Sequence, residues 1–225
     1  MNLTLFKRLI QIILFLLILN CNMQQRFNFS PKEKKSGNQK IVKSLAIETF
    51  QDLRPKDIES RIGYFFIPFV FWESREWQRR DIDRFTFYKM DLVLTHALKK
   101  EFLSYKNLKE VYVATESDSK DADYLVRGKV LKTFRKETDT LYGLSVFGIF
   151  LYPFGLPFSH NQLDTEFDFE LVEAKTNKTL LSKKYPARIS GLQNIYMESF
   201  QNKMNTILQK QLESFAKDCM DVLNK

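Results

Sequence analysis

The chain has 225 residues, of which 44% are hydrophobic and 28% are charged, with a formal net charge of +8. This composition excludes an intrinsically disordered chain, and the length suits one ordinary domain. Lys7 and Arg8 contribute two of the 35 basic residues, and without them the excess over the 27 acidic residues is six. So small an excess does not indicate nucleic-acid binding, and an anionic membrane surface accounts for it equally well.

The first twenty residues have the pattern of an export signal. Lys7 and Arg8 precede an apolar run from Leu9 to Leu19 that is interrupted only by Gln11. This run is too short for a bilayer span, which needs about 20 residues, but it suits the hydrophobic part of a signal peptide. Residues 1–20 are therefore predicted to be a signal peptide.

The end of this run, Ile18-Leu19-Asn20-Cys21, resembles a bacterial lipobox of the loose, spirochaete type. Asn20 departs from the strict pattern, which has a small residue before the cysteine. The resemblance implies that Cys21 becomes the first residue of the mature protein and carries palmitate-type acyl chains. Asn22 is not the Asp that retains many such proteins in an inner membrane, which favours the outer membrane. The alternative is an uncleaved amino-terminal anchor in which Cys21 has no role.

The only other cysteine, Cys219, falls on the apolar stripe of a predicted helix and is predicted to be a buried core thiol. If Cys21 carries lipid, the exported domain has no disulfide and depends on its hydrophobic core. The stretch 21–39 is polar and basic and is interrupted by Pro31 and Gly37. It is predicted to be a flexible tether, followed by a single envelope domain at 40–225.

The elements of this domain are predicted from apolar periodicity. Strands are expected at 41–50, 111–114, 124–135, 163–171 and 180–188, and helices at 83–105 and 193–223. Residues 175–178 form a predicted turn in which Asn177 can take a left-handed conformation, and Gly191 is expected to end the last strand. The order predicts an α+β two-layer sandwich, with a mixed sheet of about five strands and two main helices on one face.

Two strands show clear alternation. In 124–135 the even positions through Phe134 are predicted to face the core, and Arg127, Lys129 and Arg135 to face solvent. In 163–171 the odd positions are apolar, and the even positions are acidic: Asp164, Glu166, Asp168 and Glu170. Cross-strand ion pairs are a better account of this acidic row than a metal site, because metal ligands converge on a point.

Several phrases resemble small bacterial envelope lipoproteins, including transport-auxiliary and outer-membrane-assembly lipoproteins whose domain is similar to the amino-terminal domain of TolB. They are SLAIETFQDLRP at 44–55, ADYLVRGKV at 122–130 and FELVEAKTNKTLLSKKY at 169–185. The resemblance covers roughly residues 40–223. It implies no catalytic residues, and it implies a role at an envelope membrane through contact with a partner protein or lipid.

No motif of a known catalytic site stands out. The chain has only seven glycines and no phosphate-binding glycine loop, and its two histidines, His96 and His160, lie far apart without nearby cysteines. No metal, cofactor or enzymatic activity is expected. His160 beside Ser159 leaves open an alternative: a hydrolase or small-ligand-binding protein with a pocket between the apolar segments.

Two apolar segments, 64–72 and 141–158, contain prolines and glycines and are expected to be loops. Three interpretations compete: core packing, a membrane interface, or docking of a partner protein. Arg75, Arg79 and Arg80 follow the first segment and favour an anionic membrane. The candidate contact residues are Phe65, Phe66, Phe69, Phe71, Trp72, Phe150, Tyr152, Phe154 and Phe158. If strand 124–135 runs parallel to the first strand, both segments leave the same edge of the sheet.

These observations predict a lipid-anchored protein of the bacterial cell envelope. It would act as a non-catalytic interaction or assembly module of the transport-auxiliary type. Acylated Cys21 would bind membrane lipid, and the aromatic segments would contact an envelope protein or the membrane surface. No nucleic-acid partner is expected.

Overall fold

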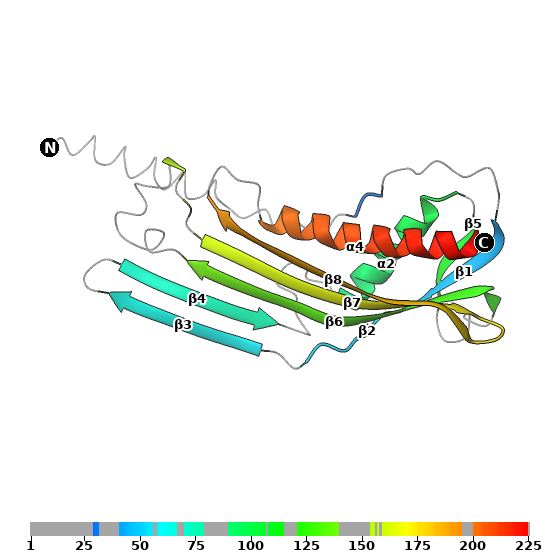
Figure 1. Cartoon of the computed structure of the whole chain (residues 1–225), viewed down its shortest axis with the longest axis horizontal. Helices are drawn as coiled ribbons and strands as arrows, with labels where there is room; N and C mark the ends of the chain where they lie inside the picture. The colour runs from blue at the N-terminus through cyan, green and yellow to red at the C-terminus, as the bar shows by residue number, and fades with distance from the viewer. Residues whose placement is uncertain are drawn as a thin grey trace, which may run out of the picture.

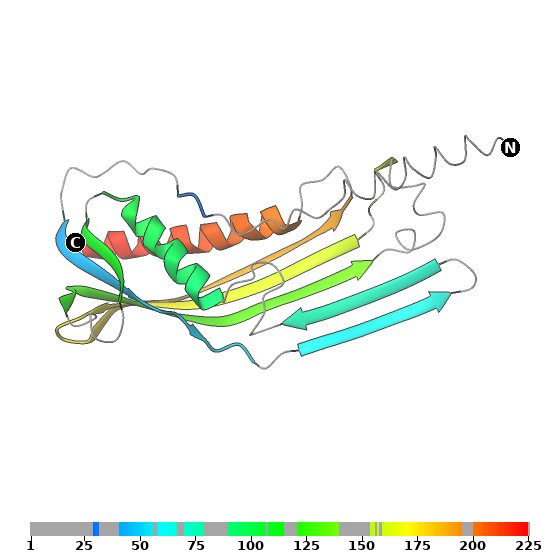
Figure 2. The same cartoon turned by 180° about the vertical axis from the view of Figure 1, so that it is seen from behind.

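A computed structural model describes residues 29–31, 41–55, 58–66, 70–78, 90–106, 108–114, 121–139, 154–155, 157, 159–194 and 200–224. Its elements are β1 (Ile41–Glu48), β2 (Gln51–Asp52), β3 (Ile58–Phe66), β4 (Val70–Gln78), α2 (Met90–Leu103), β5 (Leu108–Ala114), β6 (Tyr124–Asp139), β7 (Ser159–Glu173), β8 (Lys178–Gln193) and α4 (Phe200–Leu223). The strands form one long mixed sheet, and both helices pack on the same face of it (Figures 1 and 2). The predicted α+β two-layer sandwich is therefore confirmed.

Strand β6 is the centre of the sheet. Along one side it pairs antiparallel with β7 over nearly its whole length, and β7 pairs in the same way with β8. Along its other side β6 pairs first with β1 and β2, both parallel, and then with β4, which is antiparallel. β5 lies outside β1, and β3 lies outside β4. The sheet has more strands than expected, because β2 and the β3–β4 hairpin were not predicted.

A β-bulge at Leu131 reverses the faces of β6. Val130 pairs with Phe167, but the next paired residue, Lys132, lies opposite Glu166, so Leu131 is the extra residue. Before the bulge the even positions face the helices, as predicted. After the bulge the prediction is wrong: Arg135 lies opposite buried Leu163 on the inner face, where its side chain is only 13% exposed. Phe134 lies opposite Asp164 on the outer face.

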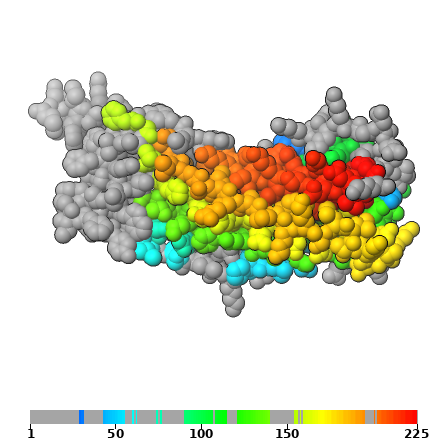
Figure 3. Space-filling view, in the orientation of Figure 1, coloured from blue at the N-terminus to red at the C-terminus, as the bar shows by residue number. Residues whose placement is uncertain are grey.

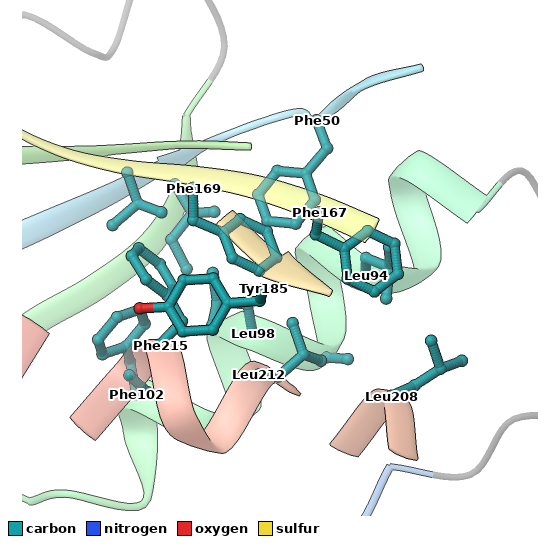
Figure 4. Packing of buried hydrophobic residues seen from close by; sticks show 14 of the residues in the cluster. Phe50, Leu94, Leu98, Phe102, Phe167, Phe169, Tyr185, Leu208, Leu212 and Phe215 are labelled. Carbon is teal, nitrogen blue, oxygen red and sulfur yellow. The ribbon is translucent and has the colours of Figure 1, made fainter. Parts of the chain in front are cut away.

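The core lies between the inner face of the sheet and the two helices (Figure 4). Phe169 of β7 is its centre, since its ring stacks on Phe215 of α4 at 4.7 Å and lies 5.3 Å from Phe50. Tyr185 of β8 and Phe102 of α2 close the cluster around Phe215. The stripe of α4 is buried as expected: Phe200, Met204, Leu208, Leu212, Phe215 and Cys219. Burial raises the pKa of the Cys219 thiol.

A polar clamp joins α4 to β8 at the edge of this core. Lys183 Nζ and Tyr185 Oη both donate a hydrogen bond to Asp218 Oδ2, each with a donor–acceptor distance of 2.7 Å. The bond from Lys183 is the main cause that lowers the pKa of Asp218. Burial, and then the bond to Asp218, raise the pKa of Tyr185. The clamp therefore holds a charged carboxylate and a neutral phenol in the folded state.

Of the smaller features predicted from the sequence, the turn is confirmed and the end of the last strand is not. The turn at 175–178 is confirmed, with Asn177 at a φ of 52°. Gly191 does not end β8 but lies within it, opposite Asn161. Residues 83–89 and 195–199 of the predicted helices lie outside the described residues. Phe29, expected in a flexible tether, is 5% exposed and belongs to the core cluster.

Gly128 is required by the packing of Phe50. A Cβ at Gly128 would lie 2.5 Å from the Phe50 ring, whereas a Cβ at Gly191 would meet only Lys203 Nζ at 3.7 Å. We predict that Gly128→Ala lowers the free energy of unfolding by about 1–3 kcal/mol through overpacking. The matched change Gly191→Ala should stay within about 0.5 kcal/mol. Urea denaturation measures both, and equal stability of the two variants would contradict the packing.

The clamp predicts an acid-sensitive contribution to stability. The pKa of Asp218 is lowered from its usual 3.8, so its stabilisation is present above pH 3.8 and is lost as pH falls through the lower folded-state pKa. Between pH 5 and pH 2, Asp218→Asn should therefore lose less stability than the wild type. Asp221→Asn, which changes an exposed carboxylate on the same helix, is the control. Identical acid profiles for Asp218→Asn and wild type would refute this contribution.

Candidate functional site

One end of the sheet brings the two apolar segments together. β6 runs parallel to β1, which is the condition set by the sequence, and its last residue, Asp139, lies opposite both Glu73 of β4 and Ser159 of β7. The end of β3, the start of β4, the end of β6 and the start of β7 therefore meet. We call this the aromatic end, because the strands that flank the two apolar segments in sequence, β3 with β4 and β6 with β7, meet here (Figure 1).

The predicted contact residues are placed as follows. Phe65 and Phe66 end β3, and Phe71 and Trp72 lie at the start of β4, so most of 64–72 is a hairpin and the predicted loop is wrong. Phe65 lies opposite Phe71, and Tyr64 lies opposite Trp72. Pro68 falls between the two strands, where no ladder hydrogen bond is required of it. The other predicted site residues, Cys21, Phe69, Phe150, Tyr152 and Phe158, lie outside the described residues.

Phe154 is the predicted contact residue whose side chain the structure describes. It is 81% exposed, more than any other large exposed hydrophobic side chain of the described residues. The neighbouring Gly155 accepts a 2.7 Å hydrogen bond from Asn194 Nδ2 through its carbonyl oxygen. Asn194 follows the last residue of β8, Gln193, which lies opposite Ser159. Phe154 is thus held at the aromatic end with its ring in solvent.

A row without acidic residues, lysine or arginine crosses the outer face at the same end. The register places Ile62, Ser74, Thr138, His160 and Leu192 opposite one another across β3, β4, β6, β7 and β8. Residues directly opposite share a face of the sheet. Ile62 and Leu192, at the two ends of this outer row, are 52% and 49% exposed. Ile62 and Leu192 thus expose apolar side chains on the two edge strands of this end, with Ser74, Thr138 and His160 between them, which the sequence alone did not reveal.

The inner face at the aromatic end is polar and internally bonded. Arg135 Nη2 donates to Asn161 Oδ1 over 3.0 Å, and the guanidinium group lies 5.2 Å from the ring centre of Phe200. Asn161 Nδ2 donates in turn to Ser159 Oγ at 3.0 Å and to Gln193 Oε1 at 3.2 Å. Ser159 and Asn161 are fully buried. These bonds link the ends of β6, β7 and β8 and fix the position of the aromatic end.

The acidic row of β7 forms ion pairs on the outer face, as expected, but with partly different partners. Lys129 reaches Glu170 at 3.2 Å, and the other pairs are Lys132–Asp164, Lys184–Glu166 and Arg188–Asp164. Arg127 pairs with Glu48 instead, and Arg135 is on the inner face.

A shallow hollow of about 260 Å³ lies between β7 and β8. Figure 3 shows β8 along the surface of the molecule. It is lined by Lys132, Asp164, Thr165, Glu166, Pro186, Ala187 and Arg188. The described residues include no group of three or more His, Cys, Asp or Glu side chains placed to hold a metal ion.

The alternative catalytic pair does not assemble. Ser159 is fully buried on the inner face, and His160 is exposed on the outer face, because successive residues of a strand point to opposite sides. His160 therefore cannot serve as a base for Ser159. His96 is exposed on α2, away from both. The hollow between β7 and β8 is lined by neither His160 nor Phe154.

The described part of the chain contains no helix whose length and apolar character would let it span a bilayer.

The sequence matches no protein-family model and none of the curated proteins. In its backbone the chain is similar to a Xanthomonas campestris protein of family DUF330, with a TM-score of 0.44 and 8% identity over 84% of this chain and 90% of that chain. It is also similar to a candidate neuraminyllactose-binding hemagglutinin homologue from Helicobacter pylori, with a TM-score of 0.45 and 9% identity over 86% and 91%. A candidate lipoprotein from Caulobacter crescentus CB15 gives a TM-score of 0.29 and 10% identity over 60% and 80%. Likenesses this distant assign no function.

Because of the bulge, Arg135 faces the buried inner side of the sheet and Lys136 faces the outer side. Arg135 is bonded on the inner face, whereas Lys136 pairs with Glu76 and its side chain is 41% exposed. We predict that Arg135→Ala lowers the free energy of unfolding by about 2 kcal/mol or more, because it removes a charged hydrogen bond from buried Asn161. Lys136→Ala should cost less than about 1 kcal/mol. Thermal or urea unfolding measures the difference, and the reverse order would place Leu131 in the regular ladder instead of a bulge.

Proposed function

We propose that this protein is a membrane-anchored lipoprotein of the bacterial cell envelope that works as a non-catalytic interaction or assembly module. Cys21 carries the lipid, and the aromatic end docks a partner protein or a membrane. The role is of the transport-auxiliary type, and the outer membrane is the favoured site.

The observation that carries the proposal is the meeting of both apolar segments at one end of the sheet. Phe154, Ile62 and Leu192 expose apolar surface there, and the hairpin places four aromatic residues on neighbouring strands beside them. Exposed apolar side chains on both edge strands of this end, together with the aromatic hairpin, favour it as a docking site. The buried network behind it, around Arg135 and Asn161, supports it as a preformed surface.

The distribution of polar groups supports a non-catalytic role. Three members of the acidic row of β7, Asp164, Glu166 and Glu170, form ion pairs with β6 and β8. Ser159 and His160 face opposite sides of the sheet. Cys219 is fully buried, and its raised pKa disfavours the thiolate that a nucleophile requires.

Lipidation is tested by metabolic labelling with radioactive palmitate. We expect label in the wild type and in Cys219→Ala, and a complete loss of label in Cys21→Ala, because only Cys21 is placed for acylation. The same extracts are fractionated, and Cys21→Ala should move from the membrane to the soluble fraction if the signal is otherwise cleaved. Equal label in wild type and Cys21→Ala would sink the lipoprotein proposal.

A further inference from the structure

The amino-terminal segment is pinned to the folded domain much closer to Cys21 than the sequence indicated. Phe29 is 5% exposed within the core cluster, and the Ser30 carbonyl oxygen accepts a hydrogen bond from Gln209 Nε2 of α4 at 3.5 Å. Figures 1 and 2 show residues 29–31 midway along α4. Eight residues, from Cys21 to Asn28, therefore separate the proposed lipid from the first buried residue, rather than the whole of 21–39.

This stretch, which we call the leash, limits how far the domain can stand from its bilayer. Eight residues span at most about 28 Å when fully extended. The path from Gln209 to the aromatic end has two parts. Along α4, the distance from Gln209 to Phe200 is about 14 Å. Phe200 contacts Arg135 of β6, and along β6 the distance from Arg135 to Asp139 is about 13 Å. The aromatic end is thus within reach of a bilayer that holds Cys21, and some part of the domain surface must lie close to that bilayer.

The two ends of the sheet differ in what they would present to a membrane. The aromatic end exposes Phe154, Ile62 and Leu192, and its outer row contains no acidic or basic residue apart from His160. The opposite end, where β1, β5 and β6 begin and the β7–β8 turn lies, exposes charged side chains: Lys106, Lys109, Glu110, Asp121, Lys175 and Lys178. Charged groups resist dehydration, whereas aromatic and aliphatic side chains are favoured at a bilayer interface. The aromatic end also contains Glu73 and Asp139, and the opposite end exposes Leu103, so the difference between the two ends lies in Phe154 and the outer row.

We propose that the aromatic end rests on the same bilayer that holds Cys21, so that the domain stands on the membrane at two points. The first point is the lipid, and the second is the end of the sheet where Phe154, Ile62 and Leu192 are exposed and β3 is followed by β4. Phe29 is the positioning residue, because its burial in the core fixes the end of the leash on the domain. This inference rests on the proposed lipidation, and it selects the lipid surface over a partner protein as the occupant of the aromatic end.

The two tryptophans of the chain are natural probes of this orientation. Trp72 and Trp77 both lie on β4, with Trp72 about 17 Å nearer the aromatic end. The variants Trp77→Phe and Trp72→Phe each leave one reporter in the full lipidated chain. Each is reconstituted into phosphatidylethanolamine–phosphatidylglycerol vesicles, with and without lipids brominated on the acyl chains, and tryptophan fluorescence is measured. Vesicle flotation of the same samples reports whether the lipid anchor holds.

We expect Trp72 to be quenched by brominated lipid and Trp77 to be quenched at least threefold less. Absence of quenching at both positions in protein that floats would overturn the inference while leaving the lipid anchor intact. Equal quenching at both positions would overturn it too, because the hairpin would then lie flat or immersed. Protein that carries no lipid and does not float would fail the proposed function itself, and the two-point attachment with it.

A longer leash tests the role of Phe29 without disturbing the core. Inserting twenty Gly/Ser residues between Gln25 and Arg26 lengthens the leash from eight to 28 residues and leaves Phe29 in place. The effective concentration of the aromatic end at the bilayer should then fall about sixfold, by the −3/2 power of length. We expect the quenched fraction of Trp72 to fall accordingly while flotation is unchanged. Phe29→Ala should act in the same direction, provided that circular dichroism shows a folded domain, and unchanged quenching in the insertion variant would refute the leash.

Discussion

The hydrogen bonds of β6 are the constraint on which the rest of the structure depends. β1, β2, β4 and β7 all pair directly with this strand, and β3, β5 and β8 are attached through them. Its two sides carry different partners at different points, parallel strands near Tyr124 and the antiparallel hairpin near Asp139. The hairpin thereby becomes an extension of the sheet instead of a separate arm, and Figure 1 shows it continuing past the start of α4.

The bulge at Leu131 lets one strand serve two environments. Before it, β6 contributes Val126 and Val130 to the core beneath α2 and α4. After it, the inner face changes from apolar packing to the hydrogen-bonded group around Arg135 and Asn161. Hydrogen-bonded buried polar groups are rigid and specific, so this network helps the ends of β6, β7 and β8 to keep a defined shape.

Much of this fold could be predicted because its patterns are local. The alternation of 163–171 and the apolar stripe of α4 each follow from burial of one face against one neighbouring layer. The turn at Asn177 follows from the residues of the turn itself. The hairpin was missed because Pro68 within an apolar run reads equally well as a loop, and only pairing with β6 identifies the strands. The bulge was missed because Phe134 fits the uninterrupted period. For the site, the residue types were predictable, but their meeting at one end required the direction of β6, and the outer row of Ile62 and Leu192 required the register.

Cys219 has a consequence for how this protein can be studied in living cells. Its thiol is fully buried on α4, and burial disfavours the reactive thiolate. With Cys21 blocked by acylation, as proposed, the folded protein offers water-soluble thiol reagents no accessible native target. A single cysteine introduced at any exposed position would then report its own surroundings against a silent background, so the native sequence is already suited to site-directed labelling.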